Sequence, residues 1–277
     1  RVVTLQQILD ILQQITPNHL AEDWDNVGLL VGDPNQPVRR VLLALDPTVA
    51  LIDAAVHGQY DLILPHHPII FRPLKALRTD TPIGRLLATA IRHQIGVIAC
   101  HTNFDSVPDG VSDHLACLLG LEQRRPLVPS SSGCPESCGL GRIGSYVHPL
   151  SAEAFLDRLQ QALDPPWLLE AGVRPAQVRT VAVCGGSCSD VTEVAKAQGA
   201  DVFLTAEIKH AVARWAEECG IWLLDGGHFA TENPAMSVLR ERLRREAAQR
   251  GWSLTIDSAE QQAPLRLVQA NKPRGSA

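Results

Sequence analysis

The sequence predicts an α/β fold of two similar lobes with mostly parallel sheets that face each other. Short apolar runs typical of strands alternate with helix-like runs in both halves of the chain, which is the pattern of parallel β-α-β units. In addition, residues 60–64 (Tyr-Asp-Leu-Ile-Leu) resemble residues 200–204 (Ala-Asp-Val-Phe-Leu), and each run precedes polar residues, a helix-like run and a glycine-apolar strand. We therefore expect residues around 38–120 to superpose on residues around 178–258 with matching strand order.

The first half opens with a helix, because apolar residues recur at helical spacing from Leu5 to Ile15 and Thr4 is placed to cap them. The expected elements that follow are a strand at 38–45, a helix at 49–57, a strand at 60–64, a helix at 83–93, a strand at 95–100 and a helix at 110–119.

The middle of the chain changes character. Residues 124–138 are rich in Pro, Ser and Gly and are expected to form a linker or surface loop. The elements expected afterwards are strands at 142–147, 178–183, 201–205, 221–225 and 252–256, helices at 152–163, 191–198, 208–218 and about 232–250, and a frayed polar tail after residue 260. We assign an N-terminal lobe to residues 1–122, a connecting segment to 123–177, and a C-terminal lobe with a polar tail to 178–277.

The composition narrows the class of protein. The chain has 277 residues, of which 45% are hydrophobic, 20% charged and 4% aromatic, as in a globular α/β protein. Its net charge of −5 gives no support for a nucleic-acid partner, although a local basic patch stays open. The absence of a long apolar stretch or a secretory signal, and the odd count of seven cysteines, predict a cytoplasmic protein that does not cross a membrane.

Polar residues with metal-binding chemistry follow three of the predicted strands. His66 and His67 come after the strand at 60–64, Asp105 after the strand at 95–100, and His228 after the strand at 221–225. Glu232 lies four residues beyond His228, on the same face if a helix begins there. Because ligands gather at the carboxyl ends of parallel strands, we expect these five side chains to meet in one site.

The number of these residues predicts two metal ions rather than one. A structural zinc takes four protein ligands and a catalytic zinc takes three, whereas three histidines and two carboxylates suit a pair of ions bridged by a carboxylate and water. Glu232 is the candidate bridge. Imidazole with carboxylate favours Zn, Fe, Mn, Co or Ni, and a metal pair that activates water makes hydrolysis the natural reaction class.

Other polar residues lie near the predicted site. His101 is either a residue that orients a ligand or a buried polar group, and Glu207 and His210 are either acid/base groups of the pocket or a helix-terminal carboxylate and a surface histidine. Residues 24–28 are expected to form a turn at the rim of the site. Gly185-Gly186-Ser187, between a strand and a helix, is typical of a tight turn and only weakly of a phosphate loop.

Six motifs together resemble the Nif-three-like proteins, also called GTP cyclohydrolase I type 2 homologues. They are Trp24-Asp25-Asn26-Val27-Gly28-Leu29, Pro65-His66-His67-Pro68, His101-Thr102-Asn103-Phe104-Asp105, Gly141-Arg142-Ile143-Gly144, Ala200-Asp201-Val202-Phe203-Leu204-Thr205 and Asp225-Gly226-Gly227-His228-Phe229-Ala230-Thr231-Glu232. The resemblance implies two similar α/β lobes, a dinuclear metal centre with ligands His66, His67, Asp105, His228 and Glu232, and a toroidal homohexamer. The segment 123–177 is too short for the extra domain that long family members insert between the lobes.

Two functions are compatible with these features. The first is a metal-dependent hydrolase of a nucleotide-like or phosphorylated small molecule, with the GTP cyclohydrolase-type activity that the family name implies. The second is a non-catalytic metal-binding ring that acts as a regulator, a metal handler or a partner-binding scaffold. If Glu207, Lys209 and His210 face the metals, catalysis is favoured; if they face solvent, the binding ring is favoured.

Overall fold

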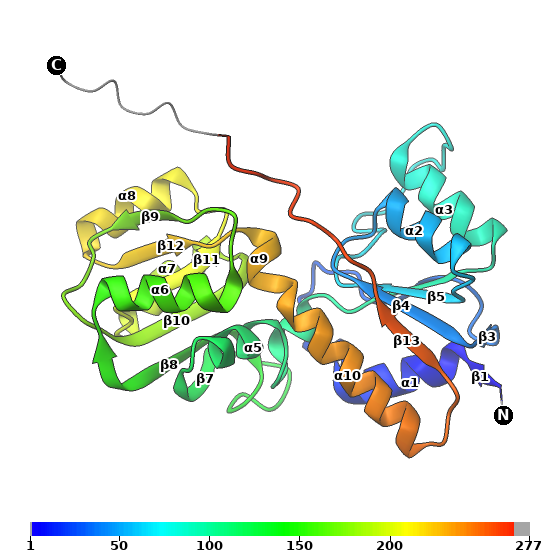
Figure 1. Cartoon of the computed structure of the whole chain (residues 1–277), viewed down its shortest axis with the longest axis horizontal. Helices are drawn as coiled ribbons and strands as arrows, with labels where there is room; N and C mark the ends of the chain where they lie inside the picture. The colour runs from blue at the N-terminus through cyan, green and yellow to red at the C-terminus, as the bar shows by residue number, and fades with distance from the viewer. Residues whose placement is uncertain (1, 269–277) are drawn as a thin grey trace.

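The computed structural model describes residues 2–268 and has two α/β lobes, each built on its own sheet (Figure 1). The first sheet has five strands in the order β13-β4-β5-β6-β2. Their bounds are β2 Gly28–Val31, β4 Arg40–Ala44, β5 Leu62–Pro65, β6 Gly96–Ala99 and β13 Thr255–Ser258. Neighbours from β13 to β6 pair in parallel, and β2 is antiparallel to β6.

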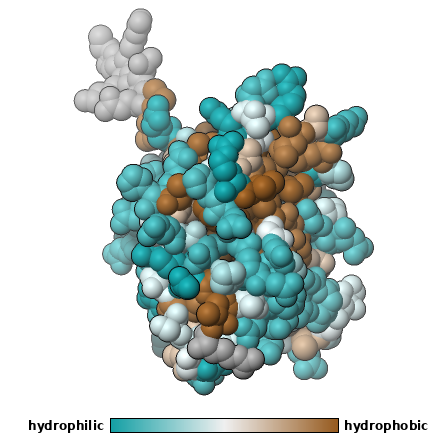
Figure 2. Space-filling model, turned by 90° about the vertical axis from the view of Figure 1, so that its right-hand side faces the viewer, coloured by the Kyte–Doolittle hydropathy of each residue, from teal (hydrophilic) through white to brown (hydrophobic). Residues whose placement is uncertain are grey.

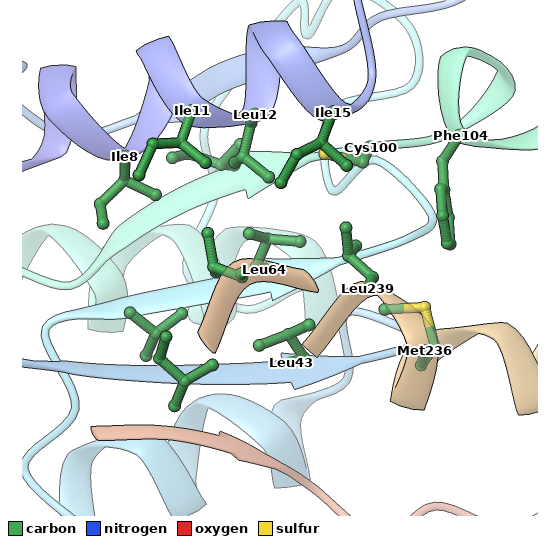
Figure 3. Packing of buried hydrophobic residues seen from close by; sticks show 14 of the residues in the cluster. Ile8, Ile11, Leu12, Ile15, Leu43, Leu64, Cys100, Phe104, Met236 and Leu239 are labelled. Carbon is green, nitrogen blue, oxygen red and sulfur yellow. The ribbon is translucent and has the colours of Figure 1, made fainter. Parts of the chain in front are cut away.

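Helices cover both faces of the first sheet. On one face, α2 (Val49–His57) and α3 (Pro82–Arg92) bury residues such as Ile52 and Leu86 in a cluster with Ile63. On the other face lie α1 (Leu5–Ile15) and α10 (Pro234–Gln249). Figure 3 shows Ile8, Ile11, Leu12 and Ile15 of α1 above Leu43 and Leu64 of the sheet, with Met236 and Leu239 of α10 beside them. A capping box between Thr4 and Gln7 begins α1, and β1 (Val3–Thr4) pairs with β3 (Pro37–Val38) next to it.

The second sheet has six strands in the order β7-β8-β10-β11-β12-β9. Their bounds are β7 Glu122–Pro129, β8 Gly139–Leu150, β9 Leu169–Gly172, β10 Val178–Ser187, β11 Val202–Ala206 and β12 Trp222–Asp225. The strands β10, β11 and β12 are parallel, and the other three pair antiparallel. Helices α5 (Val111–Leu118) and α6 (Ala152–Leu163) share one buried apolar cluster with this sheet. Helices α7 (Thr192–Ala197) and α8 (His210–Cys219) share another.

The predicted fold class is confirmed, and the centres of the two sheets match. Each sheet has three consecutive parallel strands, β4-β5-β6 in the first and β10-β11-β12 in the second. The predicted helices all form, and α2 and α6 have the bounds expected from the sequence. The short strands β1, β2, β3 and β9 were not predicted, because each has only two to four residues.

Two predictions about the chain's organisation differ from the structure. Residues 124–129 belong to strand β7, not to a loop, because Pro126 and Leu127 are buried and β7 pairs with β8 along the sheet edge, where proline is tolerated. The sheets also do not follow the boundaries 1–122, 123–177 and 178–277. The middle segment supplies β8, α6 and β9 to the second lobe, whereas α10 and β13 belong to the first.

The predicted frayed tail after residue 260 is held in place at Gln261, contrary to the prediction. Gln261 accepts a hydrogen bond from the backbone N–H of Asp46 at 3.0 Å and donates one to the Asp46 carbonyl at 2.8 Å. These bonds hold the segment after β13 across the carboxyl end of β4 (Figure 1). Residues 269–277, which the same prediction included, lie outside the described residues.

No helix within residues 2–268 is both long enough and apolar enough to cross a membrane. The face of the molecule in Figure 2 is mostly hydrophilic, with separate hydrophobic areas between the polar side chains.

Candidate metal centre

The carboxyl ends of the strands of both sheets meet between the lobes, and the predicted ligands lie there. His66 and His67 directly follow β5, and their backbone N–H groups donate to the carbonyls of Ala44 and Leu45 at 3.0 Å each. These bonds continue the pairing of β5 with β4 and fix the backbone of both histidines. His66 is fully buried, and His67 is partly exposed on the side of the second lobe.

A short helix after β6 positions Asp105. This helix, α4 (Thr102–Ser106), is anchored by Phe104, which is fully buried in the core of the first lobe (Figure 3). Burial of Phe104 fixes the rotation of α4 and leaves Asp105 facing His66, with 3.4 Å between Asp105 Oδ1 and His66 Nε2.

A second short helix, α9 (His228–Glu232), carries the two ligands from the second lobe. Gly227, with φ of +84°, turns the chain into this helix, and Thr231 ties it to β10 by accepting a hydrogen bond from Gly186 N–H at 3.0 Å. The one-turn spacing brings His228 Nε2 to 3.0 Å from Glu232 Oε2. The sequence motif at 185–187 is explained by this packing, because a Cβ at Gly186 would lie 2.3 Å from Glu232 Oε1.

The cluster contains two groups of residues that could each hold a metal ion and that share Glu232. In the first group, His66 Nε2 lies 3.4 Å from Asp105 Oδ1 and 3.8 Å from Glu232 Oε1. In the second, His67 Nε2 lies 3.0 Å from Glu232 Oε2 and 3.3 Å from His228 Nε2. All five predicted ligands are therefore brought together.

Three ligand atoms of this cluster are buried without a hydrogen bond among the described residues: His66 Nε2, Asp105 Oδ1 and Glu232 Oε2. Glu232 Oε2 lies 3.0 Å from two imidazole nitrogens, but these approaches lack hydrogen-bond geometry. Buried polar atoms are nearly always satisfied, so several unsatisfied atoms aimed at a common point need an explanation. A cation bound between them satisfies all of them, and nitrogen with carboxylate oxygen is a suitable donor set.

The histidines of the cluster are oriented by their other ring nitrogen. His66 Nδ1 lies 2.7 Å from the Cys100 carbonyl, His67 Nδ1 lies 2.7 Å from Asp46 Oδ1, and His228 Nδ1 lies 3.2 Å from Glu207 Oε2. Each Nδ1–H can donate to its oxygen, which leaves the Nε2 lone pair free to bind a metal. Asp46 is a functional residue that the sequence reasoning missed, although it follows the carboxyl end of β4 just as the predicted ligands follow their strands.

His101 also faces the cluster. Its ring centroid is 5.1 Å from that of His66 and 5.3 Å from that of His67, and these three histidines form a third group that could hold a metal ion. His101 Nδ1 lies 2.8 Å from Asp25 Oδ1. The predicted turn at 24–28 is only partly observed, because the turn covers residues 23–24 and strand β2 begins at Gly28. Asp25 lies between them, so this segment holds a histidine of the cluster.

Burial and charge both shift the pKa values of the cluster, and they act in opposite directions on His67 and His228. Burial would lower the pKa of His67, but its contacts with Asp46 and Glu232 raise it to about 10. Burial acts in the same way on His228, whose pKa is raised to about 9 by Glu232 and Glu207. Burial raises the pKa of Asp105 and repulsion from Glu232 adds to this, so a cation beside the two carboxylates would relieve their mutual repulsion.

Of the predicted residues at 207, 209 and 210, one contacts the cluster and two do not. Glu207, with φ of +54°, contacts His228 and is half exposed. His210 is exposed at the start of α8 and belongs to none of the metal-ligand groups found among the described residues. Lys209 forms an ion pair with Asp190 at 2.8 Å and is exposed. The structure thus brings Glu207 to the cluster and leaves Lys209 and His210 outside it.

A cavity of about 460 Å³ opens beside the cluster. His67, His228, Asp46 and Glu207 line it on the polar side, and the loop before β9 and the end of the described chain form much of the rest. The volume is within the range of small-molecule sites.

The chain resembles known proteins in both sequence and fold. The Duf34/NIF3 (NGG1p interacting factor 3) family model matches residues 3–264. A Streptomyces coelicolor protein named GTP cyclohydrolase 1 type 2 homolog is 37% identical over 255 residues, which cover 91% of this chain and 90% of the relative. The crystal structure of a Bacillus cereus protein related to NIF3 superposes with a TM-score of 0.89 at 25% identity, covering 97% of this chain and 100% of that one. Reduced HcgD from Methanocaldococcus jannaschii superposes with a TM-score of 0.78 at 27% identity, covering 93% of this chain and 99% of that one.

Proposed function

Because the chain belongs to the Duf34/NIF3 (NGG1p interacting factor 3) family, we propose that it is a dinuclear metal-dependent hydrolase of a nucleotide-like or phosphorylated small molecule. One observation carries the proposal: two possible metal-binding groups share Glu232, and residues of one of them, His67 and His228, line a cavity of small-molecule size. GTP is the first substrate to test, because relatives of this chain are named GTP cyclohydrolase 1 type 2 homologues.

The residues of the site divide the work of such a reaction. Two divalent cations, when bound, supply Lewis acidity and an activated water. Glu232 holds both groups together, Asp46 keeps His67 in the tautomer with a free Nε2, and Glu207 does the same for His228. Glu207 also lines the cavity, so we propose its carboxylate as the group that accepts or returns a proton. His101 completes the wall of imidazoles opposite Glu232, held there by Asp25.

We also propose that the protein assembles as a homohexamer, which rests on the family resemblance of its motifs. Light scattering on purified protein should give six chain masses. A mass of one chain at every concentration tested would remove this part of the proposal.

A non-catalytic metal-binding ring is the second candidate. It is favoured by the positions of Lys209 and His210, which lie outside the cluster. Of the three residues 207, 209 and 210, Glu207 alone contacts the cluster. In that case the protein would bind metal as tightly as the first proposal requires and would turn over no substrate.

The deciding experiment is a substrate screen on protein with a defined content of Mn, Zn or Fe. GTP, nucleoside monophosphates and model phosphodiesters are the substrates, and His67→Ala is the test variant. His93→Ala is a matched control, because His93 is an exposed histidine at the end of α3. The hydrolase proposal expects turnover by the wild type and by His93→Ala and none by His67→Ala. Equal rates in all three would indicate a contaminant, and no turnover of any substrate would favour the second candidate.

A further inference from the structure

One part of the cavity wall is apolar and the other is polar. Apolar side chains form one part, including Leu45, Pro166, Trp167, Phe229 and Leu265. The polar part consists of the carboxylates and imidazoles of the metal cluster. No Lys or Arg is among the residues found to line the cavity in the described part of the chain.

Trp167 presents a flat aromatic surface next to the cluster. A Cβ at Gly227 would lie 3.8 and 3.9 Å from two carbons of the Trp167 ring, so the indole lies across the residue that precedes His228. Trp167 is only partly buried, and its ring borders the cavity.

Two carboxylate oxygens at the cavity have spare accepting capacity. Asp46 and Glu207 each use one oxygen to hold a histidine, Asp46 Oδ1 for His67 and Glu207 Oε2 for His228. The other oxygen of each makes no hydrogen bond to a described residue, and both side chains are partly exposed, 34% for Asp46 and 53% for Glu207. These oxygens can accept hydrogen bonds from N–H donors of a ligand.

We propose that this cavity binds a flat, purine- or pterin-like heterocycle with N–H donors, stacked on Trp167 and hydrogen-bonded to Asp46 and Glu207. The inference rests on the proposed function and narrows its substrate class to molecules that carry such a ring, with the N–H edge of the ring toward the two carboxylates. Gln261, through its two bonds to the Asp46 backbone, keeps the segment 263–265 in place as the wall that closes the ring site.

The test is equilibrium binding, which does not depend on turnover. Calorimetric titrations of the metal-loaded protein use guanosine and pterin as ring ligands, purine riboside as a ring that lacks the exocyclic amine, and ribose 5-phosphate as a phosphate without a ring. Stacking on one aromatic residue contributes about 1–3 kcal/mol per base, so Trp167→Ala should weaken guanosine binding at least about fivefold. Trp167→Phe should keep most of the affinity, and Leu169→Ala, at an exposed position two residues away, should keep all of it.

The outcomes separate this inference from the proposed function. The wild type should bind purine riboside more weakly than guanosine. If Glu207→Gln removes this difference in affinity, the result supports the carboxylate contacts. The inference is overturned if Trp167→Ala binds guanosine as the wild type does, if ribose 5-phosphate binds as tightly as guanosine, or if neither ring ligand binds the wild type at about 1 mM, the weak end of specific binding. Ring binding without turnover of any substrate would instead count against the hydrolase and leave the ring site standing.

Discussion

Glu232, on a helix of the second lobe, places its Oε2 atom 3.0 Å from Nε2 of His67, which follows a strand of the first lobe. The contact joins the two sheets at the carboxyl ends of their parallel strands. Because Glu232 also belongs to two of the three groups that could hold a metal ion, it is the residue on which the candidate site depends most.

Replacement of Glu232 by Gln should therefore strip the metal. The amide is a weaker metal ligand than the carboxylate, and it has no negative charge to share between two cations. Elemental analysis should therefore show a metal content well below that of the wild type. Glu218→Gln, an exposed position on α8, is the control and should keep the wild-type content. Unchanged stoichiometry in Glu232→Gln would contradict the assignment of Glu232 as a ligand.

Metal should also stabilise the contact between the lobes. A ligand that binds only the folded state adds about 2.7 kcal/mol at a free concentration of 100 times its Kd. Chelation should accordingly lower the Tm of the wild type by several degrees, as seen by scanning calorimetry. His67→Ala should show a smaller shift. If EDTA leaves the wild-type Tm unchanged, no ion is bound between the lobes.

Arg142 should be essential for stability although it contacts no predicted metal ligand. Its buried guanidinium donates to the carbonyls of Gly139, Gly141, Ser106 and Ser137, and it lies 3.6 Å from Asp113. Arg142→Met leaves these four carbonyls without this donor and removes one of the two guanidinium groups beside Asp113, which keeps Arg124 at 3.1 Å, and the change should cost about 3–5 kcal/mol. Urea unfolding measures the loss, and Arg125→Met, at an exposed position of β7, should cost under about 0.5 kcal/mol. A loss of less than about 1 kcal/mol in Arg142→Met would show that water replaces the guanidinium.

The sequence brought the candidate metal ligands together in part because some of the information was local. His66 and Asp105 follow apolar runs that are readable as strands of the first sheet, and the carboxyl ends of parallel strands in one sheet share an edge. His228 follows a strand of the second sheet, and the meeting of the two sheets depends on contacts between the lobes. The i,i+4 spacing likewise linked Glu232 to His228. Phe104 lies between two polar neighbours in the sequence and is buried. Because its burial fixes which face of the short helix α4 points to the core, it also turns Asp105 toward the site.

What the sequence did not predict depends on pairing between distant segments. Asp46 was missed because its role is a contact with His67, and a carboxylate just before a predicted helix is ordinary. Residues 124–129 were assigned to a loop because their composition suggested one, whereas β8 recruits them as an edge strand. Strand β13 joins the first sheet beside β4, and no local signal distinguishes that partner from the second sheet.

The segment 24–28 should contribute stability that depends on pH. Burial would raise the pKa of Asp25, but hydrogen bonds from His101 and Thr102 lower it to about 2. A carboxyl whose folded pKa lies below its ordinary value of 3.8 stabilises the fold above that value, by about 2 kcal/mol here, and loses this contribution as the pH falls toward 2. Asp25→Asn should therefore be destabilised at pH 7, and its difference from the wild type should shrink between pH 4 and pH 3.

Urea unfolding of metal-free protein at several pH values measures that difference. Asp23→Asn is the matched control, because Asp23 is exposed in the same segment, and should follow the wild type at every pH. A destabilisation of Asp25→Asn that stays constant down to pH 3 would mean that the lost contribution is packing rather than ionisation.

Metal binding should release protons near neutral pH. In the metal-free protein the pKa of His67 is raised to about 10 and that of His228 to about 9, so both imidazoles are protonated at pH 7.5. A metal binds the neutral imidazole, so loading the site should release about two protons, and the apparent affinity should rise with pH until both histidines are neutral. Calorimetric titration of the metal into protein in phosphate and in Tris, which differ in ionisation enthalpy, gives the number of protons.

Glu207→Gln removes a carboxylate that raises the pKa of His228 and should reduce that number. Equal heats in the two buffers would mean that the imidazoles are already neutral, and the cluster would then have no protons for a cation to displace.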